Sequence, residues 1–559
     1  MRIRGIAAAA GGLAVASALV LSGCAAGGGD TGADKGDPSA IIIANNTEPQ
    51  NPLIPSNTNE VGGGKIVNNI FAGLVYYDAE GAPHNDAAES IETTDSQHFT
   101  VKIRKGLKFT NGDPVDAASF VDAWDWGALL SNAALNSYFF SEIKGFSWDE
   151  DSHIKGQGLN IVDDLTFTIE LTGKYSDYPL RLGYTAYDPM PKSAFADLAA
   201  FGQNPIGNGP YMFDGADAWK HNESISLVTN PDYDGPRKPA NGGITFKIYG
   251  SQDAEYAELL GDNLDVLDGL PASALTSFET DLGDRAINQP AAIFQSLAFV
   301  SNVDAFADKD AYKHFVGEEG SLRKQAISMA IDRAEITKVI FNNTRFPAHD
   351  FTSPVIAGYS EKVPGSEVLD FNAAKAKELW AQADAISPWT GTFTIAYNSD
   401  GGHKDWVDAV ANQLKNNLKI DAAGVPYAAF KEIRSKVSPS PDDHLRHITE
   451  SSWRTGWQAD YPGLYNFLGP LYGTGAGSND GDYSNPDFDA LLAKGSAASS
   501  IDEANKYYQE AQTILFKDLP VLPLWYSSIQ GGFSTKVSNV KFGWDSWPIY
   551  WQVTKQAAK

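Results

Sequence analysis

The chain has 559 residues, and because single hydrophobic cores stop growing at roughly 250–300 residues, we expect two or more lobes. Its formal net charge is −27, and no cluster of Lys or Arg offsets this charge. A surface this acidic is repelled by phosphate backbones, so we expect no nucleic-acid partner.

The first 23 residues have the layout of a secretory signal peptide. A basic start precedes a charge-free apolar run over residues 5–21, and small residues follow. Residues 21–24 resemble the bacterial lipobox, which implies cleavage before Cys24 and lipidation of its thiol by a diacylglyceryl group such as a dipalmitoyl one. Cys24 is the single cysteine of the chain, so it forms no internal disulfide. We expect a lipid anchor on the extracytoplasmic face of the cell membrane, followed by a flexible tether over residues 24–39.

The body that follows alternates between strand and helix patterns. Residues 40–46 form an apolar, β-branched run bounded by turn residues, which is typical of a buried strand. Phe99, Val101 and Ile103 alternate with polar neighbours and indicate a half-buried strand, and Asp116 can cap the helix after it. This alternation over so long a chain predicts α/β lobes.

The second half repeats the alternation of strands and helices. Residues 321–341 predict one amphipathic helix, with Ile327 and Ile331 on the same face. A strand over 391–398 is followed by a helix over 405–418. Residues 501–520 predict a helix capped by Asp502 and ended by Pro520, and a strand follows it.

The sequence contains few motifs that would indicate an enzyme. There is no G-x-S-x-G nucleophile motif, and the glycines over 62–64 lack the Walker spacing and are interpreted as a flexible turn. His444 and His447 are too few for a structural metal site, so no metal or cofactor is expected. A surface glycosidase using two carboxylates stays open as an alternative, since no short motif identifies such a pair.

One stretch, "RTGWQADYP" over 454–462, stands out. Asp460 lies between Trp457 and Tyr461, with Arg454 six residues before it. A carboxylate flanked by two large aromatic side chains is unusual for a surface loop. The stretch therefore favours binding of a ligand over catalysis, because no nucleophile or metal ligand set accompanies it.

Five segments in fixed order, this stretch included, resemble the extracytoplasmic solute-binding proteins of ABC peptide importers. They are "RKGLKFTNGDPVDAASFVDAW", "PIGNGPYMF", "NPDYDG", "LRKQAISMAIDRAEI" and "GWQADYPGLYNFL". The resemblance covers the chain from about residue 40 to its end. It implies a protein without catalysis of its own, which binds oligopeptides as a monomer and delivers them to a membrane permease driven by an ATPase.

The resemblance also implies an architecture. We expect an α/β, two-lobed periplasmic-binding-protein-like fold of type II, in the large peptide-binder variant, with a hinge between the lobes. Lobe 1 would comprise residues 40–290 and 520–559, with an inserted subdomain over about 76–203. Lobe 2 would comprise residues 291–519.

The resemblance assigns ligand-binding roles residue by residue. Asp460 would bind the peptide's amino terminus and Arg454 a carboxylate, while Trp457 and Tyr461 would wall the site. The backbone of Gly456 to Gln458 would pair with the extended peptide, and the facing loop would bring Asn46 and Glu48 near the ligand. The chain departs from the common "DYPDP" pattern by reading "DYPGL", so a sugar, nickel-chelate or haem ligand stays open.

Overall fold

The computed structural model describes residues 36–399 and 402–556. Cys24, the predicted signal peptide and the tether up to residue 35 lie outside the described residues. In the described part, none of the helices combines the length and the apolar character needed to cross a membrane.

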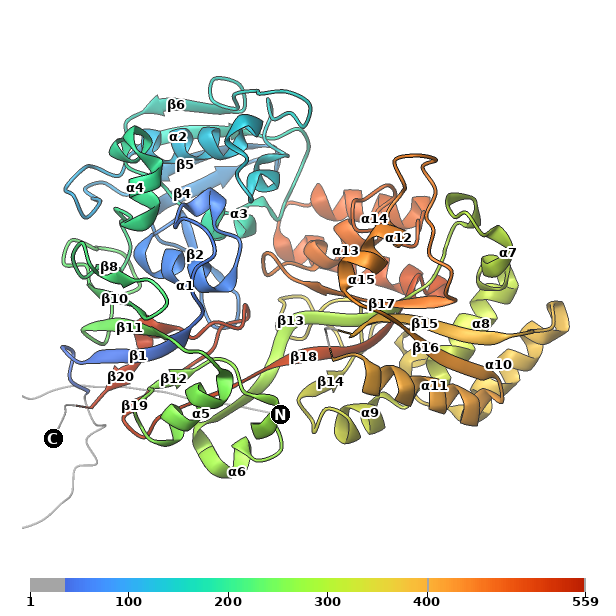
Figure 1. Cartoon of the computed structure of the whole chain (residues 1–559). Helices are drawn as coiled ribbons and strands as arrows, with labels where there is room; N and C mark the ends of the chain where they lie inside the picture. Colours follow the sequence, from blue (N-terminus) through green and yellow to red (C-terminus); the bar gives the residue numbers. More distant parts are fainter. Residues whose placement is uncertain (1–35, 400–401, 557–559) are drawn as a thin grey trace, which may run out of the picture. The chain divides into compact units, whose positions relative to one another are not determined.

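A large mixed sheet, 12-stranded in the described part of the chain, connects the two lobes (Figure 1). Its main path runs in the order β16 (Asp421–Tyr427), β15 (Thr392–Asn398), β17 (Ser452–Gln458), β13 (Ala286–Ala298), β18 (Val521–Phe533), β12 (Val266–Leu267), β1 (Ile41–Asn46), β11 (Gly243–Ile248), β10 (Ser224–Thr229) and β8 (Tyr211–Phe213). Two short strands, β14 (Arg345–Pro347) and β9 (Trp219–Lys220), pair with β18 and β10.

The two longest strands, β13 and β18, join the lobes. They pair antiparallel along their length, with a register shift between Pro290 and Phe294. Ala291 belongs to the core of the first lobe, whereas Ala292 belongs to the core of the second. On β18 the change between the two cores falls between Tyr526 and Ile529, inside the strand. The boundaries predicted for the two lobes stay predictions.

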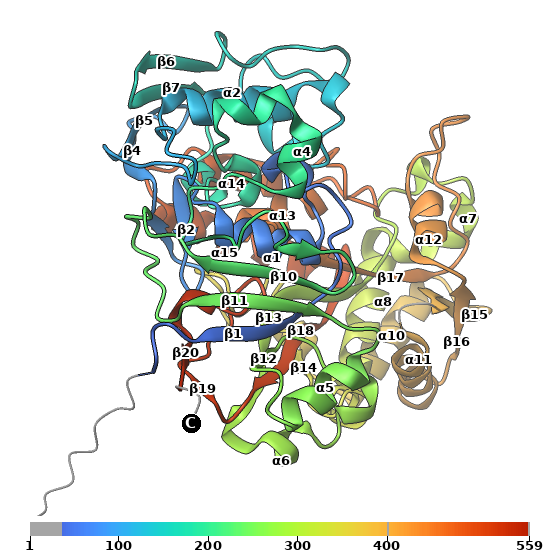
Figure 2. The same cartoon turned by 60° about the vertical axis from the view of Figure 1, so that its left-hand side comes forward.

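The first lobe contains β1, β8 to β12 and a separate four-stranded sheet, which α2 covers (Figure 2). Its other elements are α1 (Val61–Ile70), β2 (Val75–Tyr77), β3 (Pro83–Asn85), β4 (Ala88–Thr93), β5 (His98–Ile103), α2 (Ala117–Ala128), β6 (Leu159–Asp163), β7 (Thr166–Glu170), α3 (Tyr178–Arg181), α4 (Leu198–Gln203), α5 (Gln252–Leu260), α6 (Phe278–Leu282), β19 (Val537–Ser538) and β20 (Thr554–Lys555). Asp116 caps α2 as predicted, because its carboxylate accepts the Ser119 N–H at 2.9 Å.

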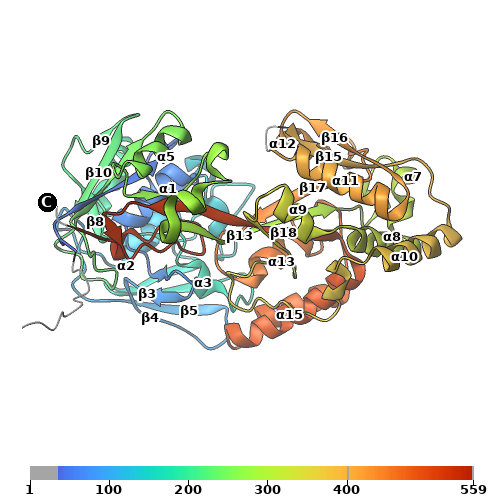
Figure 3. The ribbon, with the colours of Figure 1, turned by 90° about the horizontal axis from the view of Figure 1, so that it is seen from below.

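The helices of the second lobe are α7 (Lys309–Tyr312), α8 (Gly317–Ala330), α9 (Arg333–Val339), α10 (Ala373–Ile386), α11 (Lys404–Leu418), α12 (Phe430–Val437), α13 (Leu464–Tyr472), α14 (Pro486–Ser496) and α15 (Ile501–Asp518). In this lobe α11 and α12 pack against β15 and β16, α8 and α10 pack against each other and against α11, and α13, α14 and α15 form a separate group (Figure 3). The core between them is rich in aromatic side chains, including the fully buried Trp406, Trp453 and Trp525.

Two helix predictions are corrected. The single helix expected over 321–341 is two helices, because Asp332 accepts the Glu335 N–H at 2.9 Å and starts α9 after the extended Ile331. The cap of α15 is Ser500 rather than Asp502, since the Ser500 hydroxyl accepts the Glu503 N–H at 3.2 Å.

Candidate ligand-binding site

Asn466 in α13 binds two residues of the "WQADY" stretch, Trp457 and Asp460. Its side-chain oxygen accepts the Trp457 indole N–H at 3.1 Å and the Asp460 backbone N–H at 2.9 Å, and its amide donates to the Asp460 carboxylate at 3.1 Å. Asn466 is only 3% exposed. A buried amide that makes three hydrogen bonds has one orientation, so it fixes where the Asp460 carboxylate points.

Asp460 lines a cleft of about 550 Å³, a volume typical of small-molecule and peptide sites. The second lobe contributes Gln458, Ala459 and Asp460. The rest of the wall comes from the first lobe and the C-terminal segment: Thr47, Gln50, Thr58, Asn59, Glu60, Val61, Gly64, Asn68, Tyr77, Tyr138, Gly183, Tyr184, Thr185, Trp544, Asp545 and Trp547. The cleft therefore lies between segments that are far apart in the sequence.

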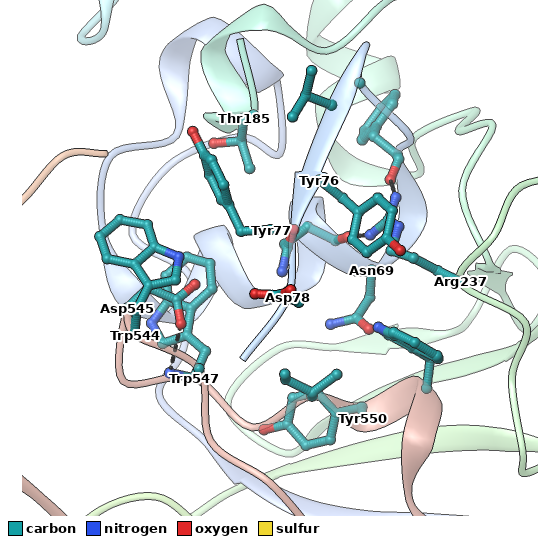
Figure 4. Close-up of a pocket in the computed structure, with 18 of the residues that line it drawn as sticks. Asn69, Tyr76, Tyr77, Asp78, Thr185, Arg237, Trp544, Asp545, Trp547 and Tyr550 are labelled. Carbon is teal, nitrogen blue, oxygen red and sulfur yellow. Dashed lines mark hydrogen bonds between the residues drawn. The ribbon is translucent and has the colours of Figure 1, made fainter. Parts of the chain in front are cut away.

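The first-lobe wall is built around the C-terminal segment that carries Trp544, Asp545 and Trp547. The same three residues extend into a smaller adjoining pocket of about 60 Å³, where Figure 4 shows them together with Tyr77. The Tyr77 and Trp544 rings meet edge to face, with their centroids 5.4 Å apart. The Tyr77 hydroxyl donates to the Leu180 carbonyl, which fixes this side of the cleft.

The glycines over 62–64 lie in the first turn of α1, so their interpretation as a flexible turn is wrong. Their role is close packing. A Cβ on Gly62 would lie 2.6 Å from the Thr47 carbonyl oxygen, and a Cβ on Gly64 would lie 2.7 Å from the Trp547 ring. The missing side chains let Trp547 and the loop after β1 approach the helix and form the cleft wall.

The cleft is lined by carboxylates and by no basic side chain among the described residues. Burial raises the pKa of Asp460, while the hydrogen bond from Asn466 and the charge of Arg181 lower it. Burial raises the pKa of Asp545 to about 6, opposed by backbone hydrogen bonds that include the one from Trp547. Burial and the Asp460 charge together raise the pKa of Tyr138 and of Tyr184, so both phenols stay neutral.

Tyr461 lies outside the lining of this cleft. It is 5% exposed, and its hydroxyl donates to Asp177 at 2.6 Å. Arg181 pairs with Asp177 at 3.1 Å and with Glu142 at 3.0 Å, and its guanidinium lies 5.2 Å from the Tyr461 ring centroid. The side chain next to Asp460 in sequence thus joins a buried ion cluster that links α3 to the second lobe.

Five further predicted site residues also lie outside the cleft lining: Trp457, Gly456, Arg454, Glu48 and Asn46. Trp457, predicted to wall the site, donates its indole N–H to Asn466 instead. The Arg454 guanidinium donates to Asn398 at 2.6 Å and lies over the Phe430 ring at 4.2 Å. Glu48 accepts hydrogen bonds from His221 at 2.7 Å, from the indole N–H of Trp219 at 3.2 Å and from a backbone N–H. Buried Asn46 donates to the Gly62 carbonyl at 3.0 Å. Its neighbours Thr47 and Gln50 line the cleft instead.

The strand predicted to receive a peptide is β17. On one side it pairs with β13 from Trp453 to Gln458. On the other side its pairing with β15 covers only Ser452 and Trp453. Gly456 and Gln458 are exposed. The second edge of this part of β17 is therefore left without a paired strand in the described chain, next to the cleft that Gln458 lines.

Sequence reasoning missed Asn466 and the aromatic first-lobe wall. The stretch "GWDSWPIYW" nevertheless carries the same signal as "GWQADYP", since Asp545 lies close to two tryptophans. This stretch becomes part of the cleft wall only because α1 and β2 lie beside it, and local sequence patterns do not show that placement. Within the described ranges, no group of three or more His, Cys, Asp or Glu side chains is arranged to hold a metal ion.

Comparisons with known proteins agree with this architecture. The oligopeptide-binding protein OppA of Bacillus subtilis is 26% identical over 534 residues, covering 91% of this chain and 92% of its own. The periplasmic oligopeptide-binding protein OppA of Salmonella typhimurium is 25% identical over 512 residues, covering 89% and 88%. The solved structure of the murein tripeptide-binding protein MppA in its unliganded open form matches with a TM-score of 0.79 at 20% identity, covering 94% of this chain and 99% of its own.

These similarities confirm the predicted two-lobed α/β fold. Residues 82–479, more than two thirds of the chain, match the profile described as bacterial extracellular solute-binding proteins, family 5. The chain therefore belongs to this family of solute-binding proteins, in agreement with the five segments of its sequence.

Proposed function

We propose that the protein is an extracytoplasmic, monomeric receptor that binds oligopeptides in the cleft and delivers them to the permease of an ABC importer. An ATPase bound to that permease would drive import. The family match and the two relatives named as oligopeptide-binding proteins support this function. The receptor itself would leave the ligand chemically unchanged.

The observation that carries the proposal is the oriented Asp460 carboxylate in a cleft without a basic lining residue. A peptide's α-ammonium loses hydration when it enters such a cleft, and this is costly unless a partner replaces the water. A carboxylate supplies that partner through a charge-assisted hydrogen bond. Because Asn466 holds Asp460 in place before the ligand arrives, little ordering of the side chain is needed on binding.

The backbone of Gly456 to Gln458 would provide the second element of recognition. An extended peptide can add to a strand edge through main-chain hydrogen bonds, which are independent of its side chains. The edge of β17 beside the cleft has the position for this role. Trp457 supports it indirectly, since its indole N–H is held by the same Asn466 that orients Asp460.

The N-terminal segment would anchor the receptor to the membrane. We propose that signal cleavage leaves a lipidated Cys24 and that residues 24–39 serve as the tether. Acyl chains add about 0.8 kcal/mol of membrane affinity per buried CH₂ group. Mass spectrometry of the mature N-terminus tests this, and a Cys24→Ala protein that stays on the membrane would contradict it.

The test of the function is calorimetric titration with matched pairs of free and N-acetylated peptides. The wild-type protein should prefer the free peptide, because acetylation removes the charge that Asp460 recognises. Asp460→Asn should lose most of this preference, at a cost of roughly 2–5 kcal/mol in affinity for the free peptide. The matched control is Asp304→Asn, which removes an exposed carboxylate paired with Lys309. Equal affinity of the wild-type protein for both peptide forms would refute the amine site.

The other ligand classes left open by the sequence are tested in parallel. Thermal-shift screening compares peptides with cello-oligomers, nickel chelates and haem, and native mass spectrometry identifies ligand retained during purification. Intact ligand after long incubation separates a receptor from a glycosidase or peptidase. A retained sugar or metal chelate would overturn the peptide assignment while keeping the family.

A further inference from the structure

The charged residues that line the cleft are all acidic. Among the described lining residues they are Glu60, Asp460 and Asp545, and there is no Lys, Arg or His. Glu60 caps α1, and its carboxylate oxygens accept the Gly63 N–H at 2.9 and 3.0 Å. Asp460 and Asp545 therefore remain as two carboxylates facing one cavity, whereas a single α-ammonium needs only one of them.

Asp545 is held in place by its own loop. Its carboxylate accepts the Trp547 backbone N–H at 3.1 Å, and Figure 4 shows this bond. A Cβ on Gly543 would lie 2.6 Å from the same carboxylate oxygen, so a glycine is needed there to admit it. The carboxylate makes no ion pair with any residue that the structure describes.

Arg237, the basic residue that lines the smaller pocket, already binds other groups. It lines the smaller pocket together with Asp545, Asp78 and Asp188. Its guanidinium donates to the Asp86 carboxylate at 2.8 Å and to backbone carbonyls of Phe71 and Asn68. Asp78 binds His84 at 2.8 Å. The charged groups around Asp545 thus leave its negative charge uncompensated.

Aromatic rings enclose the space beside the two carboxylates. Tyr77, Trp544 and Trp547 lie on the side of Asp545, and Tyr138 and Tyr184 line the same cleft. The faces of such rings attract cations, most strongly for Trp. Carboxylate and ring faces together make a site for an ammonium or guanidinium group, and they favour it over a neutral or anionic group.

Accepting the proposed peptide-binding function, we propose that the cleft selects peptides with two cationic groups. Asp460 binds the α-ammonium, and Asp545 with the rings of Tyr77, Trp544 and Trp547 binds a Lys or Arg side chain near the amino terminus. The proposed ligands are thus basic peptides. Their second positive charge would pair with Asp545, which has no ion-pair partner in the described chain.

The test uses three sets of tripeptides that place lysine, norleucine or glutamate at one position in turn, over an alanine background. Norleucine matches the lysine chain without its charge. We expect the wild-type protein to bind the best lysine peptide about tenfold more tightly than its norleucine match, which corresponds to about 1.4 kcal/mol. Glutamate peptides should bind more weakly than norleucine peptides at that position.

The variant Asp545→Asn should bring the lysine-to-norleucine affinity ratio towards one, and Asp545→Glu should restore part of it. Asp304→Asn, which removes an exposed charge elsewhere, should leave the ratio unchanged. As a second readout, the ratio should shrink when the pH falls from 7.5 to 5, because Asp545 takes up a proton over this range. Circular dichroism checks that each variant is folded.

The outcomes separate the two proposals. Equal binding of lysine and norleucine peptides by the wild-type protein, or a ratio that persists in Asp545→Asn, overturns the basic-peptide preference and leaves the peptide receptor intact. Absence of binding by every peptide overturns the proposed function, and the preference falls with it.

Discussion

The neighbouring residues Asp460 and Tyr461 reach two different regions that contain carboxylates. The regions differ in whether those carboxylates are paired with a cation. Tyr461 reaches the cluster of Arg181, Asp177 and Glu142, where each group has a partner and exposure is small. Asp460, one residue earlier, faces a cleft whose lining has acids and no base. Removing one partner of a charge pair buried within the chain destabilises the fold, whereas an oriented carboxylate that makes no direct ion pair is available to a ligand.

The largest expected effect comes from breaking the balanced cluster. Arg181→Leu should lower the free energy of unfolding by about 3–5 kcal/mol, because Asp177 and Glu142 then stay behind without their cation. Chemical denaturation followed by tryptophan fluorescence measures this. Lys309→Ala, which removes a cation from an exposed pair, should cost less than about 1 kcal/mol. Similar costs for the two variants would show that the cluster is not a structural ion pair.

The next largest effect is expected from removing Asn466, which orients the Asp460 carboxylate in the cleft. Asn466→Ala removes the hydrogen bonds that orient Trp457 and Asp460. We expect peptide affinity to fall by about 1–3 kcal/mol, since buried polar groups lose their partner. Calorimetric titration measures the loss, with Asn505→Ala as a control on a half-buried Asn that lies outside the cleft lining. Unchanged affinity would mean that Asp460 needs no orientation by α13.

Removing an unbalanced carboxylate should stabilise the ligand-free protein. The pKa of Asp545 is raised to about 6 in the folded state from an ordinary value near 4. The folded state therefore holds the proton more tightly, and stability is lost as the pH rises through about 6. Most of this loss occurs between about pH 4 and pH 6, so Asp545→Asn should gain about 2 kcal/mol at pH 7.5 and less than about 1 kcal/mol at pH 4.5.

Thermal melts of Asp545→Asn and of the wild-type protein at both pH values measure this gain. Asp304→Asn serves as the control, since an exposed carboxylate should show no such pH dependence. A loss of stability at pH 7.5 would show that the Asp545 charge is compensated in the folded protein.

The smallest expected effect is that of Glu48, for which the structure and the sequence prediction differ. Glu48 was expected near the ligand, but its carboxylate binds His221 and Trp219 and lies outside the cleft lining. Glu48→Gln should therefore change peptide affinity by less than about threefold and stability by less than about 1 kcal/mol. A tenfold loss of affinity would show that Glu48 contributes to peptide binding.

Elements that depend on local chemistry could be predicted from the amino-acid sequence. The strand of residues 41–46 follows from its β-branched run, and the start of α2 follows from the carboxylate of Asp116. The family could be predicted because five segments occur in a fixed order, and Asp460 could be singled out because it belongs to one of them. These features rest on residues close together in the chain, where patterns can be read directly.

Which of the predicted site residues lie together depends on the packing of elements that are distant in the sequence. Asp460 and Gln458 reach the cleft, while the adjacent Tyr461 turns to Asp177 because α3 presents an ion pair there. Asp545 and its tryptophans face Asp460 because β18 returns the C-terminal segment to the first lobe and the glycines of α1 make room for Trp547. Such contacts join residues tens to hundreds of positions apart, and their energy depends on packing that no local pattern encodes.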